Sequence, residues 1–87
     1  MEITKNDKAY IFVLTIEHSE DWAEVYAFEK FQDANQFATA RAKFIAKANW
    51  GAEAPPENWS EYNRRIVDDF LPGSLIAISE VPLRKTS

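Results

Sequence analysis

The chain of 87 residues contains no cysteine, only two glycines and a single histidine, and each scarcity excludes a class of site. Without cysteine there is no disulfide, no thiolate nucleophile and no cysteine-based zinc site. Gly51 and Gly73 are too far apart to build the glycine-rich loop that cradles phosphate groups. His18 has acidic neighbours but no second histidine, so we expect an exposed turn histidine and no bound metal or cofactor.

The sequence also lacks a recognisable catalytic motif. Ser19 stands next to His18, but it has neither a third residue to orient the imidazole nor a glycine-rich turn around it. A pair of carboxylates working as in glycosidases needs a deep cleft, which so small a domain rarely provides. These features favour a binding protein over an enzyme.

Charge is unevenly distributed along the chain, whose formal net charge is −4. The segment 17–33 holds six acidic residues against one base, Lys30. Basic residues are not clustered as a phosphate-backbone binder requires, so no direct contact with nucleic acid is expected. An acidic cluster suits a partner with a basic surface. The alternative is that the charge simply keeps a small domain dispersed.

Composition predicts one packed domain over residues 1–87, because 46% of the residues are hydrophobic and 14% aromatic. The N-terminal residues contain no apolar core of a signal peptide and no apolar run is long enough to span a membrane, so we expect a cytoplasmic protein. Residues 1–8 and 83–87 are polar, and we expect a mobile lead-in and a mobile tail.

The most apolar part of the chain, residues 9–29, predicts a β-hairpin with an acidic connection at 18–21. Its first arm is apolar on both faces, which is typical of a central strand. Its second arm alternates between a large face and a small one. The large face consists of Trp22, Glu24, Tyr26 and Phe28, and the small face of Ala23, Val25 and Ala27. Periodicity does not decide which face is core and which is surface.

A first helix is predicted from Asp33 to about Asn49, with Asp33 and Gln36 forming a capping box. Its expected apolar stripe consists of Ala34, Phe37, Ala38, Phe44, Ile45 and Ala48. Arg41 falls within that stripe, where a structural ion pair is favoured over a cation lining a pocket. Gly51 is placed to cap the end of the helix.

A second helix is predicted to begin at the cap Asn58, with Glu61 at the capping-box position, and to stop at Pro72. Its expected buried stripe consists of Trp59, Tyr62, Ile66, Val67 and Phe70. Residues 74–81 follow as a last strand. The chain is therefore predicted to adopt an α+β fold, β-β-α-α-β. Its three-stranded antiparallel sheet has the order second–first–last, with both helices on one face.

Aromatic residues among charges are typical of protein interfaces, and they define the candidate binding residues. These are Glu20, Asp21, Trp22, Glu24, Tyr26 and Trp50. In size and acidity the chain resembles the small inhibitors encoded by phages and mobile elements, such as anti-CRISPR and anti-restriction proteins. We therefore expect a non-catalytic inhibitor or adaptor that occupies a basic, nucleic-acid-binding surface of a partner protein. The alternative is a homodimer with a cleft between subunits for a small ligand and with weak enzymatic activity.

Overall fold

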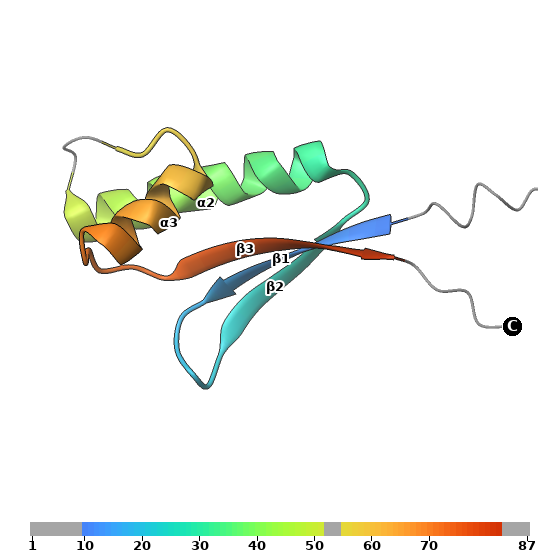
Figure 1. Cartoon of the computed structure of the whole chain (residues 1–87), viewed down its shortest axis with the longest axis horizontal. Coiled ribbons are helices and arrows are strands. Elements are labelled where there is room, and N and C mark those ends of the chain that lie inside the picture. The colour runs from blue at the N-terminus through green and yellow to red at the C-terminus, as the bar shows by residue number, and fades with distance from the viewer. Residues whose placement is uncertain (1–9, 52–54, 83–87) are drawn as a thin grey trace, which may run out of the picture.

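The computed structural model describes residues 10–51 and 55–82. Ala9, the predicted lead-in 1–8 and the predicted tail 83–87 lie outside the described residues. The elements follow one another as β1 (Tyr10–Glu17), β2 (Ala23–Phe28), α2 (Phe31–Trp50), α3 (Trp59–Asp68) and β3 (Leu75–Pro82). The strands form one antiparallel sheet in the order β2-β1-β3, and both helices cover the same face of it (Figure 1). The predicted fold class, strand order and placement of the helices are confirmed.

β1 lies at the centre of the sheet, between β2 and β3. Leu14 and Ile16 point toward the helices and are fully buried. They pair with Tyr26 and Glu24 of β2 on one side and with Ile78 and Ile76 of β3 on the other. Since side chains alternate along a strand, this register fixes which residues of both outer strands face the helices.

The large face of β2 is the face that packs on the helices. The rings of Tyr26 and Phe28 lie 4.7 and 5.6 Å from the ring of Phe37 on α2. The small face, Ala23, Val25 and Ala27, therefore points to the opposite side of the sheet. This settles the choice that the sequence pattern left open.

α2 begins two residues before the predicted start. Its N-cap is Lys30, whose side chain makes no capping hydrogen bond, and Asp33 lies inside the first turn. The predicted capping box was therefore wrong, although a carboxylate in the first turn still interacts favourably with the helix dipole. At the other end Gly51 is the C-cap as predicted, with φ of 86° and its N–H bonded to the carbonyl of Lys47.

Alanines bring α2 close to the sheet. The buried residues are Ala34, Ala38, Ala42, Ile45 and Ala46, most of them spaced by four residues along one side of the helix. Phe44 and Ala48 are exposed, contrary to prediction. The buried stripe follows the alanines, and its position leaves Phe44 on the solvent side.

α3 begins as predicted, with the side chain of Asn58 accepting a hydrogen bond from the amide of Glu61 at 2.8 Å. Tyr62 is completely buried and belongs to the core together with Leu14, Ile16 and Ile76. The other core members are Ala38, Ala42, Ile45 and Ala46, with Trp59 and Ile66 packed against them.

The predicted stripe of α3 was too long at its C-terminal end. The helix ends at Asp68, and Val67 and Phe70 are 58% and 89% exposed. Within the described segments, no helix is long and apolar enough to cross a membrane.

Candidate functional site

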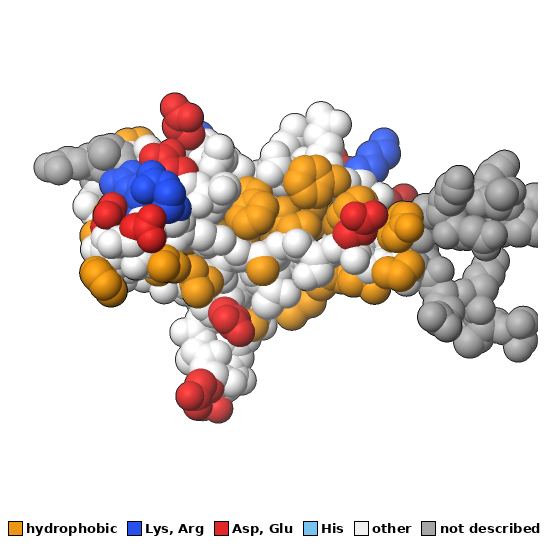
Figure 2. Space-filling view, in the orientation of Figure 1, with side chains coloured by type: hydrophobic (Ala, Val, Ile, Leu, Met, Phe, Trp, Pro, Cys, Tyr) orange, Lys and Arg blue, Asp and Glu red, His pale blue; other side chains and the backbone are white. Residues whose placement is uncertain are grey.

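The connection between β1 and β2 presents the acidic end of the molecule. Glu17, Glu20 and Asp21 are exposed there, and Figure 2 shows acidic side chains at the tip of the projecting hairpin. The turn is closed by the amides of His18 and Ser19, which both donate to the carbonyl of Trp22. Three carboxylates are thus held on a short, well-bonded turn. We call Glu17, Glu20 and Asp21 the acidic tip.

Trp22 lies against the acidic tip and is 58% exposed. Its ring stacks on the imidazole of His18, with centroids 4.2 Å apart and an interplanar angle of 23°. Stacking fixes the orientation of an aromatic side chain that solvent still reaches. An exposed, preoriented tryptophan beside carboxylates has the properties of an interface anchor.

Glu24 and Tyr26 lie elsewhere, on the helix-facing side of β2. The carboxylate of Glu24 accepts hydrogen bonds from Tyr26 Oη at 2.6 Å and from Arg41 Nη2 at 2.7 Å. Nε2 of His18 is the third donor, at 2.7 Å from Oε2. The structure therefore separates these two candidate residues from the acidic tip and places them in a half-buried polar cluster. Arg41 forms the predicted ion pair.

The electrostatics of this cluster follow from its hydrogen bonds. The bond from Tyr26 lowers the pKa of Glu24, and His18 and Arg41 lower it further against the opposing effect of desolvation. The same bond raises the pKa of Tyr26, because a phenolate could not donate to the carboxylate. Glu24 is therefore held as an anion whose charge is already compensated by Arg41. Its carboxylate thus has three hydrogen-bond donors within the protein.

His18 joins the cluster to a distant part of the chain, since its Nδ1 lies 2.9 Å from Oγ of Ser74. Its side chain is only 20% exposed, so the prediction of an exposed turn histidine was wrong. Because a carboxylate only accepts hydrogen bonds, Nε2 carries a proton and donates to Glu24, and in the neutral imidazole Nδ1 then accepts from the Ser74 hydroxyl. In the sequence, the serine next to His18 is Ser19, but the serine that bonds to the imidazole is Ser74. Ser74 stands 56 positions away, and no local signal reveals it.

Serine, histidine and carboxylate in a row are the groups of an acyl-transfer triad, but their surroundings here do not suit that chemistry. Arg41 shares the carboxylate with His18, and the backbone N–H of Ser74 donates to Tyr62 Oη at 2.9 Å. That N–H is therefore not directed at a bound oxyanion. The chain of bonds instead ties the hairpin to α2 and to the segment before β3, and it holds the hairpin in place.

Trp50 is the last residue of α2 and contacts the segment before β3. Its indole N–H donates to the carbonyl of Pro72 at 2.7 Å, and its ring stacks on Tyr62 with centroids 5.4 Å apart. The guanidinium of Arg65 covers it at 4.7 Å from the ring centroid. The ring is thus partly buried against the core, whereas Trp22 is 58% exposed.

The two helices leave the opposite face of the sheet uncovered. None of the candidate binding residues named from the sequence lies on this face. It is formed by Ile11, Val13 and Thr15 of β1, Ala23, Val25 and Ala27 of β2, and Leu75, Ala77, Ser79 and Val81 of β3. We call these ten residues the open face. None of them carries a charge, and Val25 is 63% exposed. At one end the face reaches Glu17, which pairs with Ala23 and Leu75, and there it meets the acidic tip.

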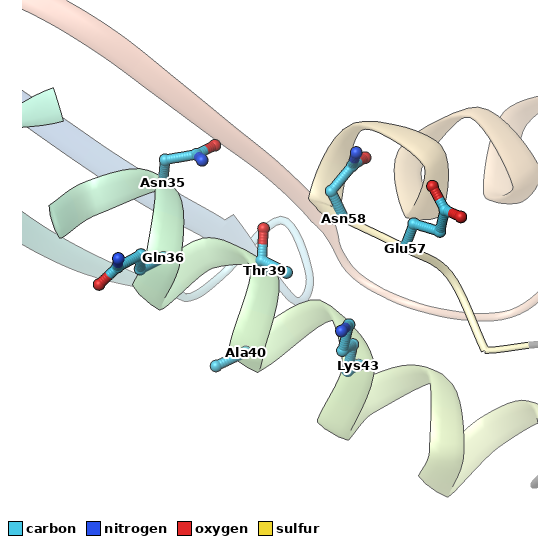
Figure 3. A pocket seen from close by; sticks show the side chains of 7 residues that line it. All are labelled: Asn35, Gln36, Thr39, Ala40, Lys43, Glu57 and Asn58. Carbon is cyan, nitrogen blue, oxygen red and sulfur yellow. The ribbon is translucent and has the colours of Figure 1, made fainter. Parts of the chain in front are cut away.

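A groove of about 470 Å³ lies between α2 and the start of α3 (Figure 3). Asn35, Gln36, Thr39, Ala40, Lys43, Glu57 and Asn58 line it. Two of its amide oxygens are already occupied, because Asn35 accepts from the indole of Trp59 and Asn58 caps α3. The lining contains neither a histidine nor a pair of carboxylates, so it is poorly equipped for acid–base catalysis.

Among residues 10–51 and 55–82, no three histidine, cysteine or acidic side chains come together as metal ligands. No protein-family model matches the chain, and neither the curated proteins nor the solved structures contain a significant match. The described residues thus form an α+β domain in which the helices cover one face of the sheet and leave the other uncovered.

Proposed function

We propose that the chain is a small protein-binding domain that engages its partner through the open face and the acidic tip together. The observation that carries this proposal is the arrangement of charge. Ten side chains without a charge adjoin three exposed carboxylates at one end. Uncovered apolar faces of this kind mark interaction sites in small soluble domains.

The open face and the acidic tip together define the kind of surface that the partner must present. It requires an apolar surface that can cover Val25 and Leu75, with basic residues on one side to meet Glu17, Glu20 and Asp21. Basic surfaces of this kind include those that bind nucleic acid. The proposal therefore includes an inhibitor or adaptor that works in the cytoplasm, as phage-like accessory proteins do, by occupying such a surface. Trp22, stacked on His18 beside the acidic tip, would be the aromatic anchor.

The test uses matched surface variants of the whole protein as baits in a native extract. Val25→Glu places a charge on the open face, and Val67→Glu makes the same change at a similarly exposed position of α3. A third bait reverses the tip with Glu20→Lys and Asp21→Lys. A specific partner should be retained by wild type and Val67→Glu, and lost from Val25→Glu.

Kinetics with the purified partner then separate the two parts of the surface. Tip reversal should slow association at least about tenfold at low salt and weaken its dependence on ionic strength, because steering by opposite charge is lost. Val25→Glu should act mainly on dissociation. A partner that binds wild type, Val25→Glu and the tip variant equally well would refute the proposal.

A further inference from the structure

β3 is an edge strand, and its two ends differ in whether the outward backbone N–H and C=O groups have hydrogen-bond partners. β1 lies on one side of it and no other strand of the described chain on the other. In an antiparallel pair, successive residues direct their N–H and C=O groups alternately toward the neighbouring strand and away from it. Once the direction of the backbone groups is known for one residue of β3, it is therefore known for every other residue of the strand.

Asn63 of α3 identifies them. Its side-chain amide donates to the carbonyl of Ile76 at 2.5 Å and accepts from the amide of Ile76 at 3.0 Å. Both backbone groups of Ile76 thus point away from β1 and are bonded as a further strand would bond them. By alternation, Ile78 and Glu80 also point outward, while Ala77, Ser79 and Val81 bond to β1.

The outward groups of Ile78 and Glu80 have no such partner. Within the described residues, no side chain and no other segment supplies a hydrogen bond to them. We call residues 78–80 the unpaired window. On one side of it Asn63 bonds to Ile76, and on the other side stands Pro82, which has no N–H. Figure 1 shows α3 over the Leu75 end of β3 and not over the half that ends at Pro82.

We propose that a second copy of this chain pairs with this window, β3 against β3, around a two-fold axis at Ser79. In this register Ile78 lies opposite Glu80 of the second copy, and Glu80 opposite its Ile78. Each such pair exchanges two backbone hydrogen bonds, so all four outward groups on each chain are satisfied. The result is a six-stranded antiparallel sheet with closed two-fold symmetry.

Three features favour a second copy over a foreign strand. The window is symmetric about Ser79. A second copy of it in antiparallel orientation therefore supplies a hydrogen-bond partner for every outward backbone group. Ala77 then faces Val81, and the one charge in the window, Glu80, faces Ile78 and not another carboxylate. The antiparallel arrangement also places the two acidic tips at opposite ends of the joined sheet, because each tip adjoins its own Leu75. Mutual repulsion of the acidic tips is thereby avoided.

The chain has no cysteine, so single cysteines report the register directly. Across the axis, position 79 would form a non-hydrogen-bonded pair with Cα atoms about 4.5 Å apart, within the range that a disulfide spans. Two copies of position 77 would instead lie four residues apart along the strand, about 14 Å. Ser79→Cys should therefore cross-link into a dimer at least about tenfold faster than Ala77→Cys or Val81→Cys alone. A mixture of Ala77→Cys and Val81→Cys should cross-link between the two variants.

A second measurement tests the backbone pairing without cysteine. Glu80→Pro removes one outward N–H and leaves the ladder to β1 intact, so the variant should fold normally by circular dichroism. In sedimentation equilibrium over a roughly hundredfold range of concentration, wild type should move from monomer to dimer, and Glu80→Pro should remain a monomer.

A wild type that stays monomeric, or a Ser79→Cys variant that cross-links no faster than Ala77→Cys, would overturn the inference. A dimer that Glu80→Pro leaves intact would overturn it as well. The inference concerns the edge of β3 and does not depend on the proposed partner. Val25→Glu changes the open face on β2 and should not affect this dimer.

Discussion

His18 and Ser74 stand 56 positions apart in the chain, and their side chains meet at 2.9 Å. The imidazole also bonds to Glu24, so one side chain connects the hairpin to the segment that leads into β3. The acidic tip and Trp22 therefore have a fixed position relative to β3. The surface proposed for partner binding depends on this connection for its shape.

Replacing His18 by alanine should destabilise the fold by about 1–2 kcal/mol, because it removes the hydrogen bonds to Glu24 and Ser74. An exposed residue of the same turn provides the control, since Glu20→Ala should change the free energy of unfolding by less than about 0.5 kcal/mol. Urea unfolding at neutral pH measures both. Equal stability of the two variants would show that the bonds of His18 contribute nothing.

Glu24→Gln should reduce stability at pH 7 by about 2 kcal/mol, because it weakens charge-assisted hydrogen bonds. The effect should depend on pH in a defined direction. Folding lowers the pKa of Glu24 below its ordinary value of 4.5, so the folded state binds this proton less readily than the unfolded state. The stabilisation is then complete above pH 4.5 and is lost as the pH falls through the lowered pKa.

The difference in unfolding free energy between wild type and Glu24→Gln should accordingly shrink on acidification below pH 4.5. Tyr26→Phe is a useful companion, since it removes the hydrogen bond that contributes most to the lowered pKa. Its own pH dependence in this range should be shallower than that of wild type. A difference between wild type and Glu24→Gln that stays constant from pH 7 to pH 3 would contradict this account.

Much of the fold could be predicted from the sequence because local signals agreed with one another. The doubly apolar first arm required a central position, and this alone fixed the strand order β2-β1-β3. Asn58 and Gly51 marked helix ends correctly because caps depend on adjacent residues. Asp33 was misassigned as a cap because the same carboxylate also suits the first turn of a helix.

The site was less accessible to prediction, since its contacts join distant segments. The polar cluster of Glu24 depends on Arg41 of α2, and the link to Ser74 depends on the topology of the whole chain. An open face opposite the helices was expected, but both faces of β2 had a plausible core pattern. Only the packing of Phe37 on Tyr26 decides which residues of β2 belong to the open face. The pairing of Asn63 with Ile76 likewise has no sequence signature.

Gly73→Ala should destabilise the fold by about 2 kcal/mol, through overpacking and through the φ of 157°, which residues with a side chain rarely adopt. A Cβ at this position would meet Tyr62 Oη at 2.6 Å and Ile66 Cδ1 at 2.8 Å. Gly51→Ala is the control, since no atom lies within 4 Å of a Cβ there and the cost should be limited to its positive φ, about 1 kcal/mol.

The clash at Gly73 can be separated from other effects by a double-mutant cycle. Tyr62→Phe removes the hydroxyl that the new Cβ would strike, so Gly73→Ala should cost less in the Tyr62→Phe background than in wild type. Thermal or urea unfolding of the four proteins gives the coupling. Strict additivity of the two changes would mean that the hydroxyl is not what excludes a side chain at position 73.

Phe70→Gly should increase stability by about 1 kcal/mol, an unusual outcome for the loss of a phenylalanine. Phe70 follows the C-cap Asp69 with φ of 54°, a left-handed conformation that disfavours residues with a Cβ and that glycine adopts freely. The ring is 89% exposed, so its removal sacrifices little buried area. Val67→Gly, one turn earlier and inside the helix, should have the opposite sign and cost about 1 kcal/mol. If Phe70→Gly proves destabilising in urea unfolding, the ring must make contacts that compensate its backbone strain. If it is stabilising, the strained phenylalanine is kept for something other than folding.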